Sequence, residues 1–402
     1  MSKIIAHIDL DAFFVRCEEI KNPSLENKPV AIGKDGRGGI VSTCSYKARE
    51  YGVKSGMPMF KAKQLCPDLI IVNGDYNYYE VLSNEFIFYT KQFTNKIEQA
   101  SIDECYADFT ELFKKNNLGA DFFKKFQEGL FLKTKLKCSI GVSTTRFLAK
   151  IGSDIKKPMG ITIIKRKDIK NILFNRPIGT YYGIGNKTSS KLKKIGINTI
   201  GDLYNNLLIN KDNIQSFFHD YKYILSTLDG TSSDEINTVK DRKQLSIGTR
   251  ETLSFDTSDY DLIKENLIKC FDVCFERFQD GNYLCGGLTI VFRFTNFKTR
   301  TYTRKLKTPS DDYQILLDNL LDDYDLIFDN QLVRQVGVTF ERLTKNTDIT
   351  IQMTLFDYQY YENKDPIYEI IRHFNSIIKD NDAKLFRASD LLKEKDGHNR
   401  SD

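Results

Sequence analysis

The sequence predicts an α+β protein of several domains, and three observations lead to this prediction. A chain of 402 residues allows two to four domains of roughly 100 to 200 residues each. Its 41% hydrophobic and 28% charged residues are typical of folded globular proteins. The hydrophobic periodicity changes repeatedly between that of strands and that of helices, so the two kinds of element alternate along the chain.

The N-terminal half contains one predicted α+β unit. An apolar strand over residues 3–9 leads directly into a helix over 13–20, and Asp11 lies between them, where a side-chain oxygen commonly caps a helix. The other elements follow the same two periods: a strand pair within 97–109, a helix near 119–133, a strand at 138–142 and a helix over 145–155.

Residues 242–343 form the clearest predicted domain, with the order βαββαβ. The predicted elements are strands at 245–253, 286–295, 299–307 and 332–341, and helices at 259–279 and 310–328. Leu288, Ile290 and Phe292 share one face of a strand while Thr289 and Arg293 point away, so one sheet face is expected to pack on the helices. The polar segment 230–241 is predicted to be a linker.

Several classes of protein are excluded by composition and spacing. No apolar stretch approaches the roughly 18 residues of a membrane helix. Asp9 and Asp11 interrupt any signal-peptide core, so we expect a cytoplasmic protein. The eight cysteines form no C-x-x-C pair, which argues against zinc and structural disulfides. The net charge of +5 does not by itself indicate nucleic-acid binding.

Carboxylates follow two of the predicted apolar strands. Asp9 closes the first, and Asp103 and Glu104 lie beside the second. Buried carboxylates need cations, oxygen ligands favour Mg²⁺, and two-metal phosphoryl-transfer sites use such groups. Asp103 and Glu104 can share a site only where the backbone bends. Spacing alone leaves open an alternative in which these acids cap a helix or occupy a turn.

The segment from Lys298 to Lys307 contains five basic residues, three threonines and no acid. This composition suits contacts with phosphates. An edge strand protected from aggregation by its charges is the alternative.

Four motifs, in order, resemble those of Y-family translesion DNA polymerases, especially the bacterial members. They are residues 8–14 (IDLDAFF), 42–53 (STCSYKAREYGV), 100–106 (ASIDECY) and 156–160 (KKPMG). The resemblance covers about residues 1–356.

The resemblance implies an α+β, multidomain right-hand polymerase fold. Its expected parts are a ferredoxin-like palm (1–10 and 75–164), small fingers (11–74), a helical thumb with a helix-hairpin-helix (165–229), the linker (230–241), a βαββαβ little finger (242–343) and a tail (344–402). The family's metal-binding carboxylates match Asp9, Asp103 and Glu104, with the Leu10 carbonyl as a further ligand of two Mg²⁺ ions. Asp11 keeps its interpretation as a helix cap.

The resemblance also implies a nucleotide site. Tyr46, Arg49 and Lys157 match residues that grip the triphosphate, and Thr43 adds a hydroxyl. Phe14 matches the steric gate that excludes a ribose 2′-hydroxyl. Phe13 beside it is assigned to the same site, although it is also expected to pack. The roof over the templating base is formed by Gly39, Ile40, Ser42 and Gly56.

Two further segments are expected to bind DNA. Residues 182–197 resemble a helix-hairpin-helix, in which Gly183, Gly185 and Lys187 would contact a phosphate. In the little finger the expected contacts are Arg250, Arg293, Lys298, Arg300 and Arg304. The pentapeptide 352–356 resembles the peptide with which bacterial polymerases bind the sliding clamp, through Gln352, Leu355 and Phe356.

The sequence therefore predicts a template-directed, low-fidelity DNA polymerase for translesion synthesis, acting as a monomer on primer-template DNA with deoxynucleoside triphosphates. No Asp-x-Glu tripeptide occurs, so the signature of a proofreading exonuclease is missing. Two alternatives remain. A nucleotidyl cyclase would not need the DNA-binding segments, and a non-catalytic DNA-binding or clamp-associated relative of a polymerase should have lost a metal carboxylate.

Overall fold

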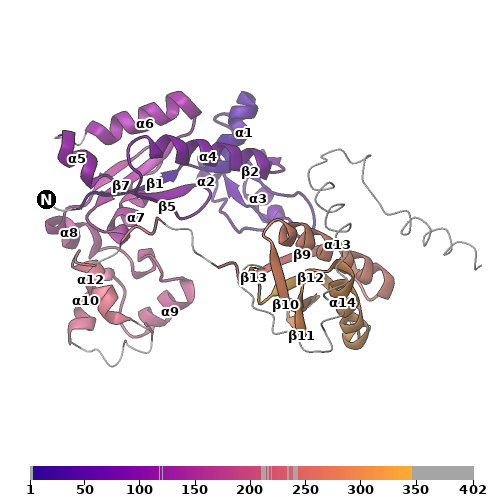
Figure 1. The fold of residues 1–402 in the computed structure, drawn as a ribbon. Coiled ribbons are helices and arrows are strands. Elements are labelled where there is room, and N and C mark those ends of the chain that lie inside the picture. Colours follow the sequence, from indigo (N-terminus) through magenta and orange to yellow (C-terminus); the bar gives the residue numbers. More distant parts are fainter. Residues whose placement is uncertain are drawn as a thin grey trace, which may run out of the picture. The chain divides into compact units, whose positions relative to one another are not determined.

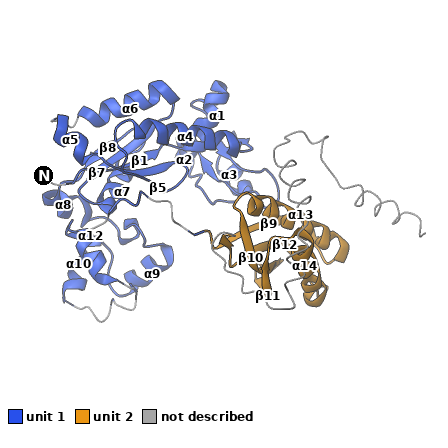
Figure 2. Cartoon of the chain, viewed as in Figure 1, with its two compact units in different colours: residues 1–243 blue, residues 244–402 orange. Residues whose placement is uncertain are grey.

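The computed structural model describes residues 3–345, except 117, 120, 210–213, 215, 216, 219, 233, 234 and 239–242. The chain divides into two compact units, residues 1–243 and 244–402 (Figure 2). Within the described ranges, no helix is long and apolar enough to cross a membrane.

A five-stranded sheet forms the centre of unit 1 (Figure 1). Its strands, in spatial order, are β5 (Ile97–Gln99), β6 (Glu104–Asp108), β1 (Ile5–Leu10), β7 (Cys138–Ser143) and β8 (Ile161–Ile163). Side chains alternate between the two faces of a strand. Ala6, Ile8 and Leu10 of β1 therefore point into the main core, while His7 and Asp9 point to the other face.

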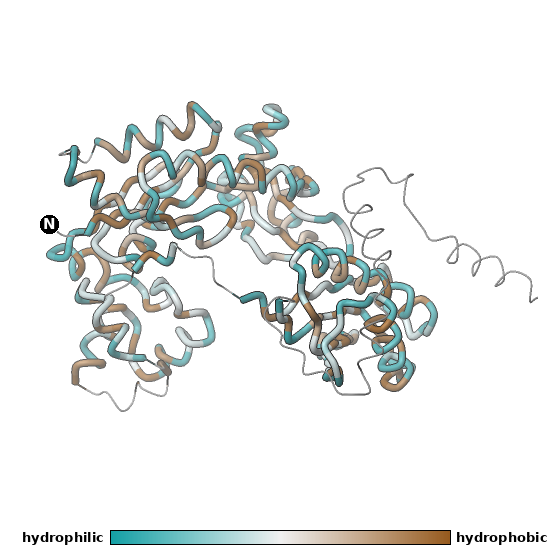
Figure 3. The backbone as a smooth tube through the Cα atoms, viewed as in Figure 1, coloured by the Kyte–Doolittle hydropathy of each residue, from teal (hydrophilic) through white to brown (hydrophobic). Residues whose placement is uncertain are grey.

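Helices cover both faces of this sheet. The core on the first face includes side chains of α1 (Phe13–Lys21), α4 (Tyr76–Lys91), α5 (Thr110–Asn116) and α6 (Asp121–Thr134). Figure 3 shows hydrophobic and hydrophilic positions alternating along α6, as expected for a helix with one buried face. On the second face lies α7 (Arg146–Ile155), which packs on β7 and β1.

Two smaller parts complete unit 1. A three-stranded sheet contains β3 (Thr43–Cys44), β2 (Val30–Ile32) and β4 (Ile70–Val72), accompanied by α2 (Tyr46–Glu50) and α3 (Met59–Leu65). A helical part contains α8 (Ile169–Leu173), α9 (Asn186–Lys194), α10 (Ile200–Ile209) and α12 (Tyr221–Leu228). Short 3-10 turns occur at Pro23–Leu25, Arg166–Asp168 and Ile178–Thr180.

Unit 2 has the predicted βαββαβ order. It contains β9 (Ser246–Thr257), α13 (Tyr260–Gln279), β10 (Tyr283–Phe294), β11 (Thr299–Ser310), α14 (Tyr313–Ile327) and β12 (Val333–Glu341), with the sheet order β11-β10-β12-β9. Leu288, Ile290 and Phe292 are buried against the helices, which confirms the predicted inner face. A short strand, β13 (Thr344–Lys345), pairs with β10, so the sheet extends two residues beyond the predicted domain end.

Candidate active site

The pairing of β1 with β6 brings the predicted carboxylates together. Asp9 lies opposite Glu104 in this antiparallel pair, so both side chains point to the face covered by α7. Asp103 immediately precedes β6, and its carbonyl accepts a hydrogen bond of 2.9 Å from the Leu10 amide. The backbone amides of Ala100 and Ser101 both donate to the Glu104 carbonyl, which makes the bend that the sequence required.

The electrostatics of the site reflect these crowded negative charges. The pKa of Asp9 is raised to about 6, chiefly by burial and also by Asp103 and Glu104, although Lys157 acts in the opposite direction. Lys157 Nζ lies 2.9 Å from an Asp9 oxygen and 2.9 Å from an Asp154 oxygen. Burial alone would lower the pKa of Lys157, but these two carboxylates raise it above its ordinary value.

Glu104 is held by groups from α7 and β1. Its carboxylate forms an ion pair with Lys150 and lies 3.0 Å from His7 Nε2. His7 and Lys150 hold the pKa of Glu104 well below its usual range, against the effect of burial. Burial lowers the pKa of His7, so its ring is neutral at neutral pH. Ser153 of α7 is 2.8 Å from His7 Nδ1 and fixes the ring orientation.

These acids could hold a metal ion. Ligand atoms of His7, Asp9 and Glu104 all lie within 4.8 Å of one another. The raised pKa of Asp9 means that the negative charge of its carboxylate is not fully compensated, even with Lys157 beside it. A divalent cation would supply that charge, so the donor set fits the predicted metal.

The predicted triphosphate residues lie on α2, on β3 and beyond the end of α7. The Arg49 guanidinium lies 4.7 Å from the Tyr46 ring centroid, and its Nε donates to the Cys44 carbonyl. Thr43 is a half-buried residue of β3. The structure places Lys157 beside Asp9, so this lysine shares one site with a predicted metal carboxylate.

The prediction that Asp11 caps α1 is wrong. The N-cap of α1 is Ala12, in a left-handed conformation, and the helix has no side-chain cap. Asp11 is instead 4% exposed and accepts hydrogen bonds from Tyr46, Ser139 and the Met159 amide. In this buried position the carboxylate accepts hydrogen bonds from more donors than it would at an exposed helix end.

The two phenylalanines after Asp11 have different surroundings. Phe14 is half-buried and stacks on Tyr79, with its ring centroid 4.6 Å away, and also contacts Tyr76. This aromatic cluster fixes the ring of the predicted steric gate. Phe13 is 3% exposed and lies in the main core. The expectation that Phe13 packs is therefore confirmed, and its nucleotide contact stays a prediction.

The predicted roof residues come from two adjacent loops. The Val41 amide donates to Met57, and the Gly56 amide donates to Val41, so segments 39–42 and 56–59 lie side by side. Ile40 is 49% exposed. A side chain on Gly39 would meet the Lys34 carbonyl at 2.1 Å, so only glycine fits there. Gly56 has a φ of +80°, which also favours glycine.

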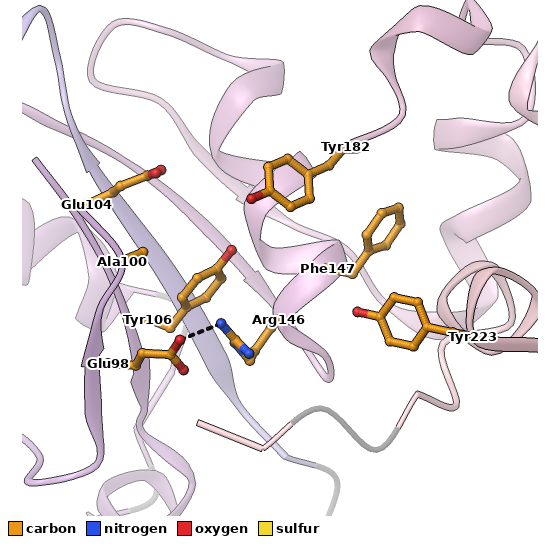
Figure 4. A pocket seen from close by; sticks show the side chains of 8 residues that line it. All are labelled: Glu98, Ala100, Glu104, Tyr106, Arg146, Phe147, Tyr182 and Tyr223. Atoms are coloured by element: carbon orange, nitrogen blue, oxygen red, sulfur yellow. Dashed lines mark hydrogen bonds and ion pairs between the residues drawn. The ribbon is translucent and has the colours of Figure 1, made fainter. Parts of the chain in front are cut away.

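A pocket of about 260 Å³ lies beside Glu104 (Figure 4). On one side are Tyr106 and the ion pair between Glu98 and Arg146, with a distance of 2.7 Å. Tyr182 and Tyr223 line it from the helical part of unit 1. The Tyr182 ring also lies 5.2 Å from the Lys150 ammonium, so this tyrosine contacts the lysine that holds Glu104.

The predicted helix-hairpin-helix has an open helix start. Gly183 has a φ of +99°, and Gly185 is the N-cap of α9, where no side chain caps the helix. Side chains built on either glycine would meet nothing within 4 Å. Lys187 is an exposed residue of the first turn of α9. This arrangement leaves backbone amides accessible to an anion.

The outer face of the unit 2 sheet, opposite its helices, carries small polar and basic residues. Register places Arg250 beside Gly337, and Arg293 between Gln335 and Thr299. A Cβ on Gly337 would lie 2.5 Å from Arg250 Cγ, so the glycine makes room for that arginine. The other outer-face positions are Ser246, Gly248, Thr252, Gly287, Thr289, Thr301, Thr303, Lys305, Thr339 and Glu341.

The expected DNA contacts of Arg300 and Arg304 need a correction. These residues pair with Phe292 and Leu288 in register, so they point to the helix side of the sheet. Arg300 forms an ion pair of 2.7 Å with Asp329, and Arg304 pairs with the buried Asp323. Their charges are therefore engaged within the protein. Lys298 is exposed in the turn between β10 and β11.

Two predictions lie partly or wholly outside the described residues, namely the tail (344–402) and the clamp-binding peptide within it. Gln352, Leu355 and Phe356 fall outside the described residues. Lys150, Ser153 and His7 were not predicted, although α7 has a polar stripe at spacings of three and four residues that could have indicated Lys150 and Ser153.

The sequence matches known families along most of its length. Residues 8–154 match the impB/mucB/samB family, residues 244–355 match the C-terminal domain of that family, and residues 166–197 match its HHH motif. Among curated relatives, DNA polymerase IV of Bacillus velezensis is 31% identical, over 99% of this chain and 95% of the relative. DNA polymerase IV of Ureaplasma parvum is 32% identical, over 88% and 98% respectively.

Solved structures agree. A Y-family DNA polymerase chimera of Dbh and Dpo4 has a TM-score of 0.74 and 29% identity, covering 85% of this chain and all of the chimera. An insertion ternary complex of Dbh DNA polymerase has a TM-score of 0.57 and 28% identity, again over 85% of this chain. The chain therefore belongs to the impB/mucB/samB family of Y-family DNA polymerases.

Proposed function

We propose that the chain is a template-directed DNA polymerase for translesion synthesis, which adds deoxynucleotides to a primer 3′-end without proofreading. The observation that carries this proposal is the convergence of Asp9 and Glu104 beside Lys150 and Lys157, with Asp103 close enough to raise the pKa of Asp9. A non-catalytic relative would have no need for half-buried, crowded carboxylates, whose charges cost stability.

The metal in this proposal is Mg²⁺, with two ions per site. Asp9, Asp103 and Glu104 would hold them, with the Leu10 carbonyl as a further ligand. When bound, the ions would supply positive charge at the attacking and leaving oxygens of the phosphoryl transfer. His7 is neutral and bound to Ser153, so we assign it to holding Glu104.

The protein's own residues position the nucleotide. Arg49 offers a planar fork and Lys157 a point charge to the triphosphate, while Tyr46 and Thr43 offer hydroxyls. Burial and the neighbouring Asp11 raise the pKa of Tyr46, so the phenol keeps its proton as a donor. Phe14, fixed by Tyr79, would collide with a ribose 2′-hydroxyl.

Low fidelity follows from the roof. Gly39, Ser42 and Gly56 are small, and only Ile40 presents an apolar side chain to the templating base in this proposal. A small roof applies little steric pressure to a mismatched or damaged pair.

In this proposal the protein binds DNA at two places. The start of α9 binds a backbone phosphate through amides near Gly183 and Gly185, together with Lys187. The outer face of unit 2 binds the duplex backbone through Arg250, Arg293 and Lys298. We assign the palm, fingers, thumb and little finger to the residue ranges expected from the sequence, with the little finger extended through β13.

We also propose that a monomeric, cytoplasmic enzyme docks on the bacterial sliding clamp through the pentapeptide 352–356. Replacing both Leu355 and Phe356 with Ala should abolish stimulation of synthesis by the clamp and leave clamp-free synthesis unchanged. Primer extension with and without clamp measures both. Stimulation that survives the double substitution would refute the docking site.

The polymerase proposal is tested by primer extension with purified protein, Mg²⁺ and single deoxynucleotides, on intact and abasic templates. We expect addition of the nucleotide complementary to the intact template, and extension past the abasic site. DNA binding without any incorporation would instead support a non-catalytic DNA-binding or clamp-associated protein.

A further inference from the structure

Asp11 is a buried carboxylate that the proposed mechanism does not use. Its Oδ1 accepts hydrogen bonds from Tyr46 Oη at 3.1 Å and from Ser139 Oγ at 2.8 Å, and its Oδ2 accepts one from the Met159 amide at 2.8 Å. The three donors belong to α2, to β7 and to the loop between α7 and β8. Asp11 therefore joins three segments that are far apart in the sequence.

Two of these segments carry proposed triphosphate contacts. Tyr46 is one of them, and Met159 lies two residues after Lys157. The third segment anchors the carboxylate to the central sheet, because Ser139 is fully buried and lies opposite Asp9 in the pairing of β1 with β7. The Asp11 amide also donates to the Lys137 carbonyl at 2.8 Å. Asp11 is thus fixed to β7, the strand that pairs with the strand of Asp9.

We infer that Asp11 is a positioning residue for the incoming nucleotide. It holds α2 and the loop of residues 156–160 in a fixed relation to β1, so that Tyr46 and Lys157 face the same triphosphate. This inference rests on the proposed function, because it needs Tyr46 and Lys157 as nucleotide contacts. Groups held in place before binding lose less entropy when the ligand arrives, which lowers the nucleotide concentration required.

The hydrogen-bond count explains how Asp11 acts without touching the nucleotide. The Tyr46 phenol has one proton, which it donates to Asp11 in the absence of nucleotide. A phosphate oxygen that accepts this proton takes the place of Asp11 in that one bond, so Asp11 orients Tyr46 only before the nucleotide is bound. The bonds from Ser139 and Met159 remain, so the carboxylate stays satisfied and the loop that carries Lys157 stays in place.

The test compares Asp11→Ala with Asp11→Asn in single-nucleotide incorporation. Alanine leaves all three donors unpaired. Asparagine can accept from the Met159 amide through its carbonyl and donate to the two hydroxyls through its amide, so it preserves the links. We expect Asp11→Ala to raise the KM for deoxynucleotide about tenfold or more, with kcat within about threefold, and Asp11→Asn to restore a KM within about threefold of wild type.

Two further variants separate positioning from general stability. Asp11→Ala and Tyr46→Phe should raise KM by less in combination than the product of their single effects, because they act on one contact.

Asp229→Ala is the matched control, since Asp229 accepts a phenol hydrogen bond of 2.8 Å from Tyr204 in the helical part of unit 1. It should leave the KM unchanged. If Asp11→Ala fails to fold, Ser139→Ala removes one bond and should raise KM by a smaller factor.

Several results would overturn the inference. One is an unchanged KM in Asp11→Ala, or in Ser139→Ala if that variant has to replace it. Another is a KM in Asp11→Asn as high as that in Asp11→Ala. A third is a combination of Asp11→Ala with Tyr46→Phe whose effect on KM equals the product of the single effects. A wild-type protein that binds DNA and incorporates nothing would refute the proposed function itself, and this outcome is read from the wild type alone.

Discussion

Two sheets of this molecule carry charge in opposite ways. In unit 1, the acids Asp9 and Glu104 face α7 and are paired with Lys157 and Lys150. On the outer face of unit 2, basic residues lie among threonines and glycines, and the ion pairs described for that unit do not include Arg250, Arg293 or Lys305. Charges in the first sheet are opposed and crowded, whereas those in the second are mostly of one sign and spread out.

The difference matches two tasks. Chemistry needs a few groups at fixed positions with unusual pKa values, and burial with close counter-charges provides both. Binding a polyanion needs many weak contacts whose sum depends on salt, and exposed cations on a flat sheet provide them. Helices cover both faces of the unit 1 sheet but only one face of the unit 2 sheet, so the acids of unit 1 lie against α7 and the basic residues of unit 2 face outward. The residues on these faces decide the task, and the presence of a sheet does not.

The largest effect should come from Asp103→Ala, which removes a proposed metal ligand from unit 1. We expect incorporation to fall roughly 10³-fold, equivalent to about 4 kcal/mol, because charge stabilisation at the reacting oxygens is lost. DNA affinity should change by less than about twofold. Single-turnover incorporation and fluorescence anisotropy measure the two quantities. If weakened DNA binding is the main defect of Asp103→Ala, the two units do not have the separate tasks proposed for them.

Next in size is Phe14→Ala, which tests the nucleotide part of unit 1. Removing the ring should reduce discrimination against ribonucleotides by at least about tenfold, because the clash with the 2′-hydroxyl disappears. The ratio of kcat/KM for deoxynucleotide and ribonucleotide gives the answer. Tyr79→Phe is a suitable control, since it keeps the ring that stacks on Phe14. An unchanged sugar preference would remove the steric-gate assignment.

A smaller effect is expected from the double variant Arg250→Ala, Arg293→Ala in unit 2. It should weaken DNA binding and make the dependence of log K on log salt shallower by about two units, one for each phosphate contact. Arg304→Ala is the comparison, because Arg304 is paired with Asp323 and faces α14. A salt dependence reduced equally by Arg304→Ala would show that the face of the sheet does not matter.

The smallest effect concerns a carboxylate with a local structural role. Hydrogen bonds from the Thr199 amide, and also from the Asn198 amide, lower the pKa of Asp202 below its ordinary value. Its stabilising effect is therefore fully present above about pH 4 and is lost as pH falls through the folded-state pKa. Asp202→Ala should cost about 1 kcal/mol of unfolding free energy at pH 7, and less at acid pH. If Asp202→Ala costs as much unfolding free energy at acid pH as at pH 7, this interpretation is wrong.

Much of the fold was predictable because its periodic signals are local. The order of elements in unit 2 follows from alternation on β10 and a helical stripe on α13. The helix α4 was not predicted, because Phe86, Ile87 and Phe88 form a run of bulky residues that resembles a strand. Only packing against the central sheet decides for the helix.

The candidate site was predictable where acids lie at the ends of strands and less so where contacts are long-range. Acids beside apolar strands made Asp9 and Glu104 candidates, and the resemblance to family motifs assigned them; the structure places Asp9 near the end of β1 and Glu104 at the start of β6. Asp11 was misassigned because its partners lie 35, 128 and 148 residues away, and no local pattern encodes them. The contact of Lys150 with Glu104 likewise depends on how α7 lies across the sheet. The orientation of Arg304 depends on the register of β11, which a one-residue shift would reverse.

The most direct test of the account is a single-turnover experiment at saturating and subsaturating DNA, with wild type, Asp103→Ala and the Arg250→Ala, Arg293→Ala double variant side by side. We predict that Asp103→Ala loses its rate at every DNA concentration. The double variant should recover the wild-type rate once DNA is saturating. A double variant that stays slow at saturating DNA, or an Asp103→Ala protein with a normal rate, would contradict the account.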